Sequence, residues 1–142
     1  MPEFTVLFDP PLPEAAPVAV PTDLDWPMVY RLSRGLNRRF LEYVISGKRW
    51  GYDREDLFNV LDDLLGALGE LESGSSQSFT MSGYSVVGVT RHDDLITFHD
   101  LGDPKGWSAQ IGLADVREAL TTAACRVWGV ISDPARGAEH EQ

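Results

Sequence analysis

Between residues 28 and 46 the apolar side chains recur three or four residues apart. They are Val29, Leu32, Leu36, Phe40 and Val44. Since positions at this spacing share one face of an α-helix, the pattern predicts a helix over this stretch. Asp25 is placed to cap its first turn, Pro27 suits that turn, and Gly47 suits its end.

A second helical pattern follows after a short connection over residues 48–52. Asp53 suits the N-cap position, and the pattern continues to Glu72, before the serine-rich residues 73–77. Leucines at helical spacing define its apolar face: Leu57, Leu61, Leu64, Leu68 and Leu71. Acidic residues occupy the opposite side, so the pattern predicts a strongly amphipathic helix.

From Ser78 onward apolar and polar residues alternate with a period of two, which is typical of strands. Three runs, over residues 84–90, 95–101 and 107–111, are separated by turn-forming sequences rich in Gly, Asp and Pro. This arrangement predicts an antiparallel meander.

Residues 1–27 contain seven prolines and five acidic side chains but no basic one. Proline fixes φ and removes a backbone donor, so this N-terminal arm is expected to be extended rather than helical. Within it, Phe4 to Phe8 predicts a short strand at the edge of a sheet.

Together these elements predict an α+β protein, a single domain over residues 1–142. An antiparallel sheet of three to four strands would pack against two or three helices. The last helix runs from Leu113 to Ile131, with a predicted buried stripe of Val116, Leu120, Ala123, Val127 and Val130. Residues 135–142 have no apolar side chain other than alanine and are expected to form a disordered tail.

The overall charge narrows the classes of function. The 142 residues carry 22 acidic side chains against 12 Lys or Arg, a net charge of −10. Contact with phosphates needs a basic face, so no nucleic-acid binding is expected. Without a leader sequence or an apolar run long enough to span a bilayer, a cytoplasmic protein without membrane contact is expected. A single cysteine, Cys125, excludes an internal disulfide.

Charge reverses between the two predicted N-terminal helices. Residues 28–52 hold six basic side chains and one acidic one, whereas residues 53–72 hold seven acidic side chains and one basic one. Helical phasing puts both charged sets opposite the apolar stripes, so both are expected to face outward, and only their flanks could pair across the seam between the helices.

The outward-facing charges define two candidate surfaces. The basic strip consists of Arg31, Arg34 and Arg38. Aromatic side chains often anchor interfaces between proteins. Trp50 and Tyr52, from the short connection over residues 48–52, are therefore added to the acidic residues as candidates for partner binding. The expected partner-binding residues are Glu55, Asp56, Asp62, Asp63, Trp50 and Tyr52.

Candidate chemistry is sparse. His92, Asp93 and Asp94 fall in a predicted turn, where Asp suits backbone hydrogen bonding, and His99 lies at the far end of the following strand. One catalytic site using both histidines is therefore not expected, and no metal or cofactor is predicted. The alternative interpretation is a small enzyme or small-molecule-binding protein with a pocket between sheet and helices, lined by Tyr84, His99 and Trp107.

The stretch from Leu64 to Leu120 resembles small actinobacterial immunity proteins found beside polymorphic secreted toxins. The resemblance lies in the sequences LLGALGELESG, SVVGVTRHDDLITFHDL and WSAQIGLADVREAL, and it covers less than half of the chain. It implies a protein that binds and neutralises one cognate toxin, often basic, without catalysis.

The leading hypothesis is therefore a non-enzymatic acidic binding protein with a protein partner, most concretely a basic toxin. Attraction between the acidic surface and such a partner would speed their association. A homodimer formed through an exposed sheet face is a third hypothesis.

Overall fold

Two antiparallel sheets and three helices make up the computed structural model, which describes residues 3–73, 78–81, 87–103 and 105–133. The first sheet has the strand order β1 (Phe4–Asp9), β2 (Arg39–Ile45), β3 (Lys48–Glu55). The second is the meander β4 (Ser78–Met81), β5 (Val87–His92), β6 (Leu95–Asp100), β7 (Ser108–Gly112). The helices are α1 (Trp26–Ser33), α2 (Leu57–Glu72) and α3 (Leu113–Ser132). The predicted α+β class is confirmed, while the predicted tail over residues 135–142 lies outside the described residues.

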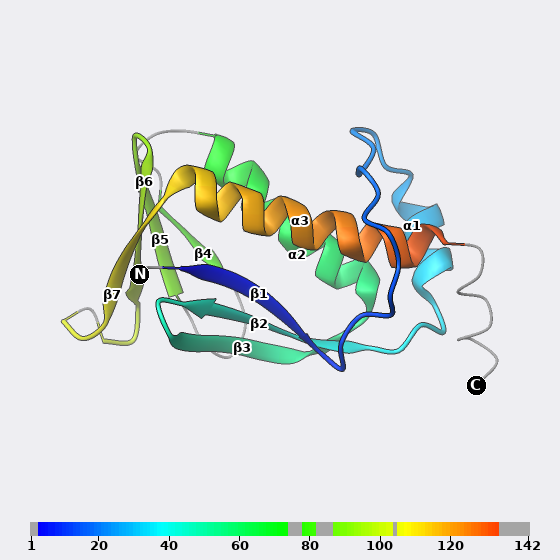
Figure 1. Ribbon diagram of the computed structural model, residues 1–142, viewed down its shortest axis with the longest axis horizontal. Coiled ribbons are helices and arrows are strands. Elements are labelled where there is room, and N and C mark those ends of the chain that lie inside the picture. The colour runs from blue at the N-terminus through cyan, green and yellow to red at the C-terminus, as the bar shows by residue number, and fades with distance from the viewer. Residues whose placement is uncertain (1–2, 74–77, 82–86, 104, 134–142) are drawn as a thin grey trace.

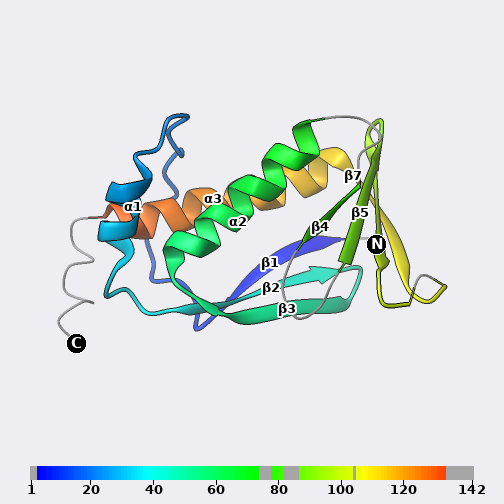
Figure 2. The same ribbon diagram turned by 180° about the vertical axis from the view of Figure 1, so that it is seen from behind.

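The two long helices lie side by side over the first sheet, with α3 against β1 and α2 nearer β2 and β3. The second sheet stands at a steep angle to the first, at one end of it (Figure 1). Seen from behind, α2 lies in front of α3 (Figure 2). None of the described helices is both long and apolar enough to span a membrane.

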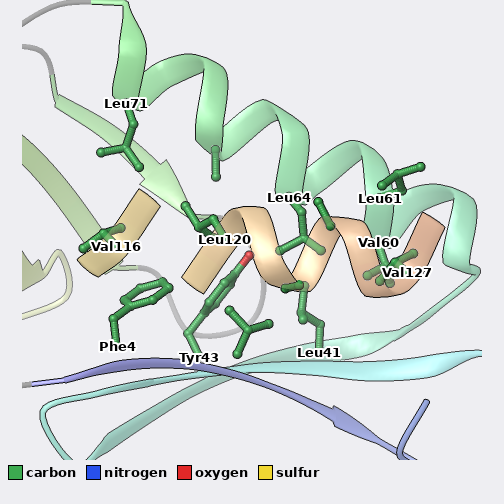
Figure 3. Close-up of a cluster of buried hydrophobic side chains, with 14 of the residues drawn as sticks. Phe4, Leu41, Tyr43, Val60, Leu61, Leu64, Leu71, Val116, Leu120 and Val127 are labelled. Carbon is green, nitrogen blue, oxygen red and sulfur yellow. The ribbon is translucent and has the colours of Figure 1, made fainter. Parts of the chain in front are cut away.

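The core fills the space between the first sheet and the two long helices (Figure 3). Tyr43 rises from β2 toward Leu64 of α2 and Leu120 of α3, and all three are buried. Phe4 of β1 stacks on Phe98 of β6, with ring centroids 5.5 Å apart, so the same core joins the two sheets. The buried residues of α3 include the whole predicted stripe, Val116, Leu120, Ala123, Val127 and Val130.

The predicted helix running to Gly47 is wrong beyond α1. The helix begins as expected, because the Asp25 side chain accepts a hydrogen bond from the Met28 backbone N–H at 3.3 Å. It ends after eight residues, followed by Gly35, whose φ of +83° no right-handed helix can continue. Gly35 rather than Gly47 therefore marks the end of the helix.

The rest of that stretch is β2, in which every second residue is buried: Arg39, Leu41, Tyr43 and Ile45. Ser46 and Gly47 then reverse the chain with φ values of +48° and +85°. Positive φ at both central residues is what a tight two-residue hairpin requires. The segment expected to be a connection, residues 48–52, therefore lies in β3.

The remaining predicted elements are confirmed with small shifts. α2 starts after an N-cap at Asp56 rather than Asp53, and it ends at Glu72 as predicted. The meander forms as expected, with β7 beginning at Ser108, one residue later than predicted. Its first predicted strand is β5, which continues to His92 instead of ending at Thr90, while residues 84–86 of that prediction lie outside the described residues. β1 is an edge strand, also as predicted.

Residues 10–25 form an arm without helix or strand that passes over the C-terminal half of α3 (Figure 1). The Val18 backbone N–H donates to the Cys125 carbonyl at 3.2 Å, and Leu12 is buried. At Gly129 of α3, an added Cβ would lie only 2.5 Å from the Ala16 carbonyl oxygen. The arm is therefore packed closely on the helix.

Removing the cap of α1 should destabilise the protein slightly. Asp25→Ala deletes the acceptor for the Met28 N–H, so we expect unfolding to become easier by about 1 kcal/mol. Urea titration of both chains measures the difference. Asp23→Ala, an exposed acid two residues earlier, is the matched control, and equal losses from both substitutions would contradict a capping role for Asp25.

Candidate partner-binding groove

Trp50, expected to anchor a partner from a short connection, is a buried residue of β3. It is 5% exposed, and its ring centroid lies 5.2 Å from that of Trp107. The Lys48 ammonium lies 4.7 Å from the Trp50 ring and 3.7 Å from the Asp100 carboxylate. This cluster joins β3 to β6 and to the start of β7, so its contacts hold the two sheets together. Tyr52 lies on the same strand, β3.

The four acidic residues expected at the interface are divided between two places. Glu55, half-buried, ends β3 opposite the buried Arg39, while the Asp56 carboxylate lies 3.5 Å from the Arg38 guanidinium. The other two lie on α2: Asp62, which is exposed, and Asp63, which is half-buried. Arg38 and Asp56 thus form an ion pair at the protein surface, beside the β2–β3 hairpin rather than across a seam between two helices as expected.

The basic strip does not form on one helix face, because α1 ends before it could. Arg31 belongs to α1, Arg34 is its C-cap residue, and Arg38 lies in the segment before β2. All three side chains are exposed, and the Arg34 guanidinium lies 6.0 Å from the Tyr30 ring centroid.

The structure does not bring the residues of the alternative pocket together. Tyr84 lies outside the described residues. On β6, Phe98 is buried on the inner face, whereas His99 points the other way and lies against Gly88 of β5. Trp107 packs on Trp50 instead, with the two ring centroids 5.2 Å apart.

The histidine and aspartate cluster is a hairpin end. His92 is the last residue of β5, and Asp93, with a φ of +54°, forms the turn with Asp94. In the part of the chain that the structure describes, no three His, Cys, Asp or Glu side chains are arranged to hold a metal ion.

A groove that the sequence did not predict opens between β1 and α3. The two elements run side by side in the same direction (Figure 1). The groove has a volume of about 480 Å³ and is lined by residues 3–6 and by one face of α3 from Asp115 to Arg126. It therefore lies on the side of α3 that faces away from α2.

One wall of the groove is the open edge of β1. The Ser46 N–H donates to the Glu3 carbonyl at 2.8 Å, so the backbone of Glu3 faces β2. Backbone polar groups point to alternate sides along an antiparallel strand, so those of Phe4 and Val6 point away from β2. Among the described strands β1 pairs only with β2, and the groove therefore has backbone donors and acceptors along this wall.

The charges of the groove are separated along its length. Glu3 comes just before β1, and Asp115 and Glu118 lie near the start of α3, so three exposed carboxylates share one end. Arg126, also exposed, lines the other end. The helix wall between them has only small side chains, Ala119, Thr122 and Ala123. Small side chains let another backbone approach closely.

Sequence reasoning missed this site because its parts are far apart in the chain. The edge strand was predicted, and Asp115 and Glu118 lie outside the predicted buried stripe of α3. No pattern in the sequence places these acids beside a strand more than a hundred residues earlier. No protein-family model, no curated protein and no solved structure matches this chain, so the site is defined by its own geometry.

Proposed function

We propose that this protein is a non-enzymatic binding protein for a basic protein partner. The observation that carries the proposal is the groove, where an open strand edge lies beside three exposed carboxylates. Extended segments of other proteins bind such edges through main-chain hydrogen bonds, and carboxylates at the rim favour basic residues. The net charge of −10 adds attraction at longer range.

The most concrete version of this proposal is an immunity protein that neutralises a toxin. The resemblance of residues 64–120 to actinobacterial immunity proteins supports it. Inhibition by binding needs a tight, specific surface but no catalytic group, and the groove offers such a surface. The toxin would be a basic protein.

A partner captured from the source organism should therefore be basic and should bind in a salt-dependent way. With the purified partner, we expect the association rate to fall at least about tenfold between about 0.05 M and 0.5 M NaCl, because salt screens the attraction. Stopped-flow mixing measures this rate. An acidic partner, or an association rate that does not change with salt, would contradict the proposal.

The immunity version has its own test in cells. The captured partner should arrest growth when produced alone, and co-production of this protein should restore growth. If the captured basic partner does not arrest growth, the immunity role is contradicted, and only the proposal of a binding protein remains.

A further inference from the structure

We infer that the partner contributes an extended, basic segment that adds as a strand to the free edge of β1, inside the groove. The inference rests on the proposed function and deepens it by assigning the surface and the chemistry of the ligand. It is carried by the length of the groove, the direction of its backbone groups and the placement of its charges.

The length of the groove suits a short strand. Asp115 and Arg126 are separated by eleven helical positions, or about 16 Å at the rise of an α-helix. A strand advances about 3.3 Å per residue, so about five extended residues fill this length.

The backbone groups of Phe4 and Val6 face the position such a strand would occupy. Both side chains are buried in the core, while the register with β2 points the backbone groups of these two residues toward the open edge. An added strand would satisfy these donors and acceptors as β2 does on the other side. The small residues of α3 leave room above it.

Charge selects a basic segment and places its basic side chains at one end of the groove. Lys or Arg side chains would meet Glu3, Asp115 and Glu118 at one end, while Arg126 disfavours basic residues at the other. A second copy of this chain is a poor occupant, because its own β1, Phe4–Asp9, carries no Lys or Arg side chain to meet these carboxylates. Carboxylates beside an open edge thus favour a basic strand from another protein over a second β1.

The direct probe is a seven-residue peptide of Lys and Val, blocked at both ends, whose Lys residues alternate with Val in one half only. We expect saturable binding by fluorescence anisotropy, with backbone amide NMR shifts at Phe4 and Val6. The same peptide with every interior amide nitrogen methylated keeps its charge but loses its donors, so its affinity should fall at least about tenfold. A Glu and Val peptide should not bind.

Matched variants of the protein separate the groove from general acidity. Asp115→Lys with Glu118→Lys should weaken peptide binding at least about tenfold, whereas Asp62→Lys with Glu70→Lys, an equal charge change on α2, should weaken it no more than about twofold. Asp115→Asn with Glu118→Gln removes the charge while keeping the shape, in case the lysine variant does not fold. Circular dichroism checks that each variant is folded.

Several results would overturn the inference: absent binding of the Lys and Val peptide, equal binding of its methylated form, a larger loss from the α2 variant, or NMR shifts confined to α2. A dimer in light scattering whose β1 edge is occupied by another copy would also overturn it. If a basic partner is captured and any of these results follows, the proposed function stands and strand addition is lost. If the peptide binds as expected but no basic partner is captured, the proposed function is contradicted, whereas the assignment of the groove as a strand-binding surface remains.

Discussion

Phe98→Ala is expected to lower the free energy of unfolding by about 3–5 kcal/mol. The ring is fully buried, and it stacks on Phe4 with centroids 5.5 Å apart; Phe4 in turn lies 5.6 Å from Tyr43. Three rings thus connect β6, β1 and β2, and removing the first leaves a cavity where the two sheets meet. Domains of this size are usually stable by about 5–15 kcal/mol, so the loss is a large share of the total.

Urea unfolding followed by tryptophan fluorescence measures this effect, since Trp50 and Trp107 lie where the sheets join. Thr97→Ala is the control: the neighbouring residue of β6 is only partly buried and alternates to the other face of the strand. We expect that substitution to cost less than about 1 kcal/mol. Similar losses from the two substitutions would mean that the sheets do not depend on the ring stack.

Gly129→Ala should destabilise the protein although alanine is the better helix former. In an open helix position the exchange would stabilise by about 1 kcal/mol. Here the new Cβ would lie 2.5 Å from the Ala16 carbonyl oxygen, so the arm or α3 must move. We expect a net loss of about 1–3 kcal/mol, as for other overpacked sites.

Gly66→Ala supplies the matched control for this prediction. Gly66 lies within α2, and a Cβ added there would meet no atom within 4 Å beyond its own helix backbone, so this exchange should stabilise by about 0.5–1 kcal/mol. Urea titration measures the change in the free energy of unfolding for each variant. A loss for Gly129→Ala together with a gain for Gly66→Ala would show that the arm is packed on α3. If both substitutions stabilise the protein, the contact between the arm and α3 contributes little to the free energy of unfolding, which would contradict the prediction.

The sequence predicted elements best where only one periodicity was present. α3 keeps its apolar residues at helical spacing for five turns, and the meander alternates cleanly between turns rich in glycine and aspartate. In β2, however, apolar residues lie on both faces of the strand, so Phe40 and Val44 fit helical spacing equally well. Glycine decided the outcome: Gly35 and Gly47 both adopt positive φ, and the first ends a helix while the second turns a hairpin.

The candidate site was less predictable because its residues meet only through the tertiary fold. The acids of residues 55–63 dominate the local sequence, yet Asp56 lies near Arg38 and Glu55 faces Arg39 across the hairpin. Both pairings follow from β2 and β3 forming a hairpin, which was not predicted. The groove combines acids from two ends of the chain, and neither group stands out from the sequence alone.

The distance in sequence between the two walls of the groove has a consequence during synthesis. Residues 3–6 leave the ribosome before residues 115–126, which follow all of the described strands, so a nascent chain exposes the edge of β1 before α3 can cover its face. If a partner adds as a strand in the groove, as proposed, its recognition requires a chain that has folded through α3. Proteolysis before α3 would keep β1 but remove the helix wall of the groove, and it should then abolish this binding.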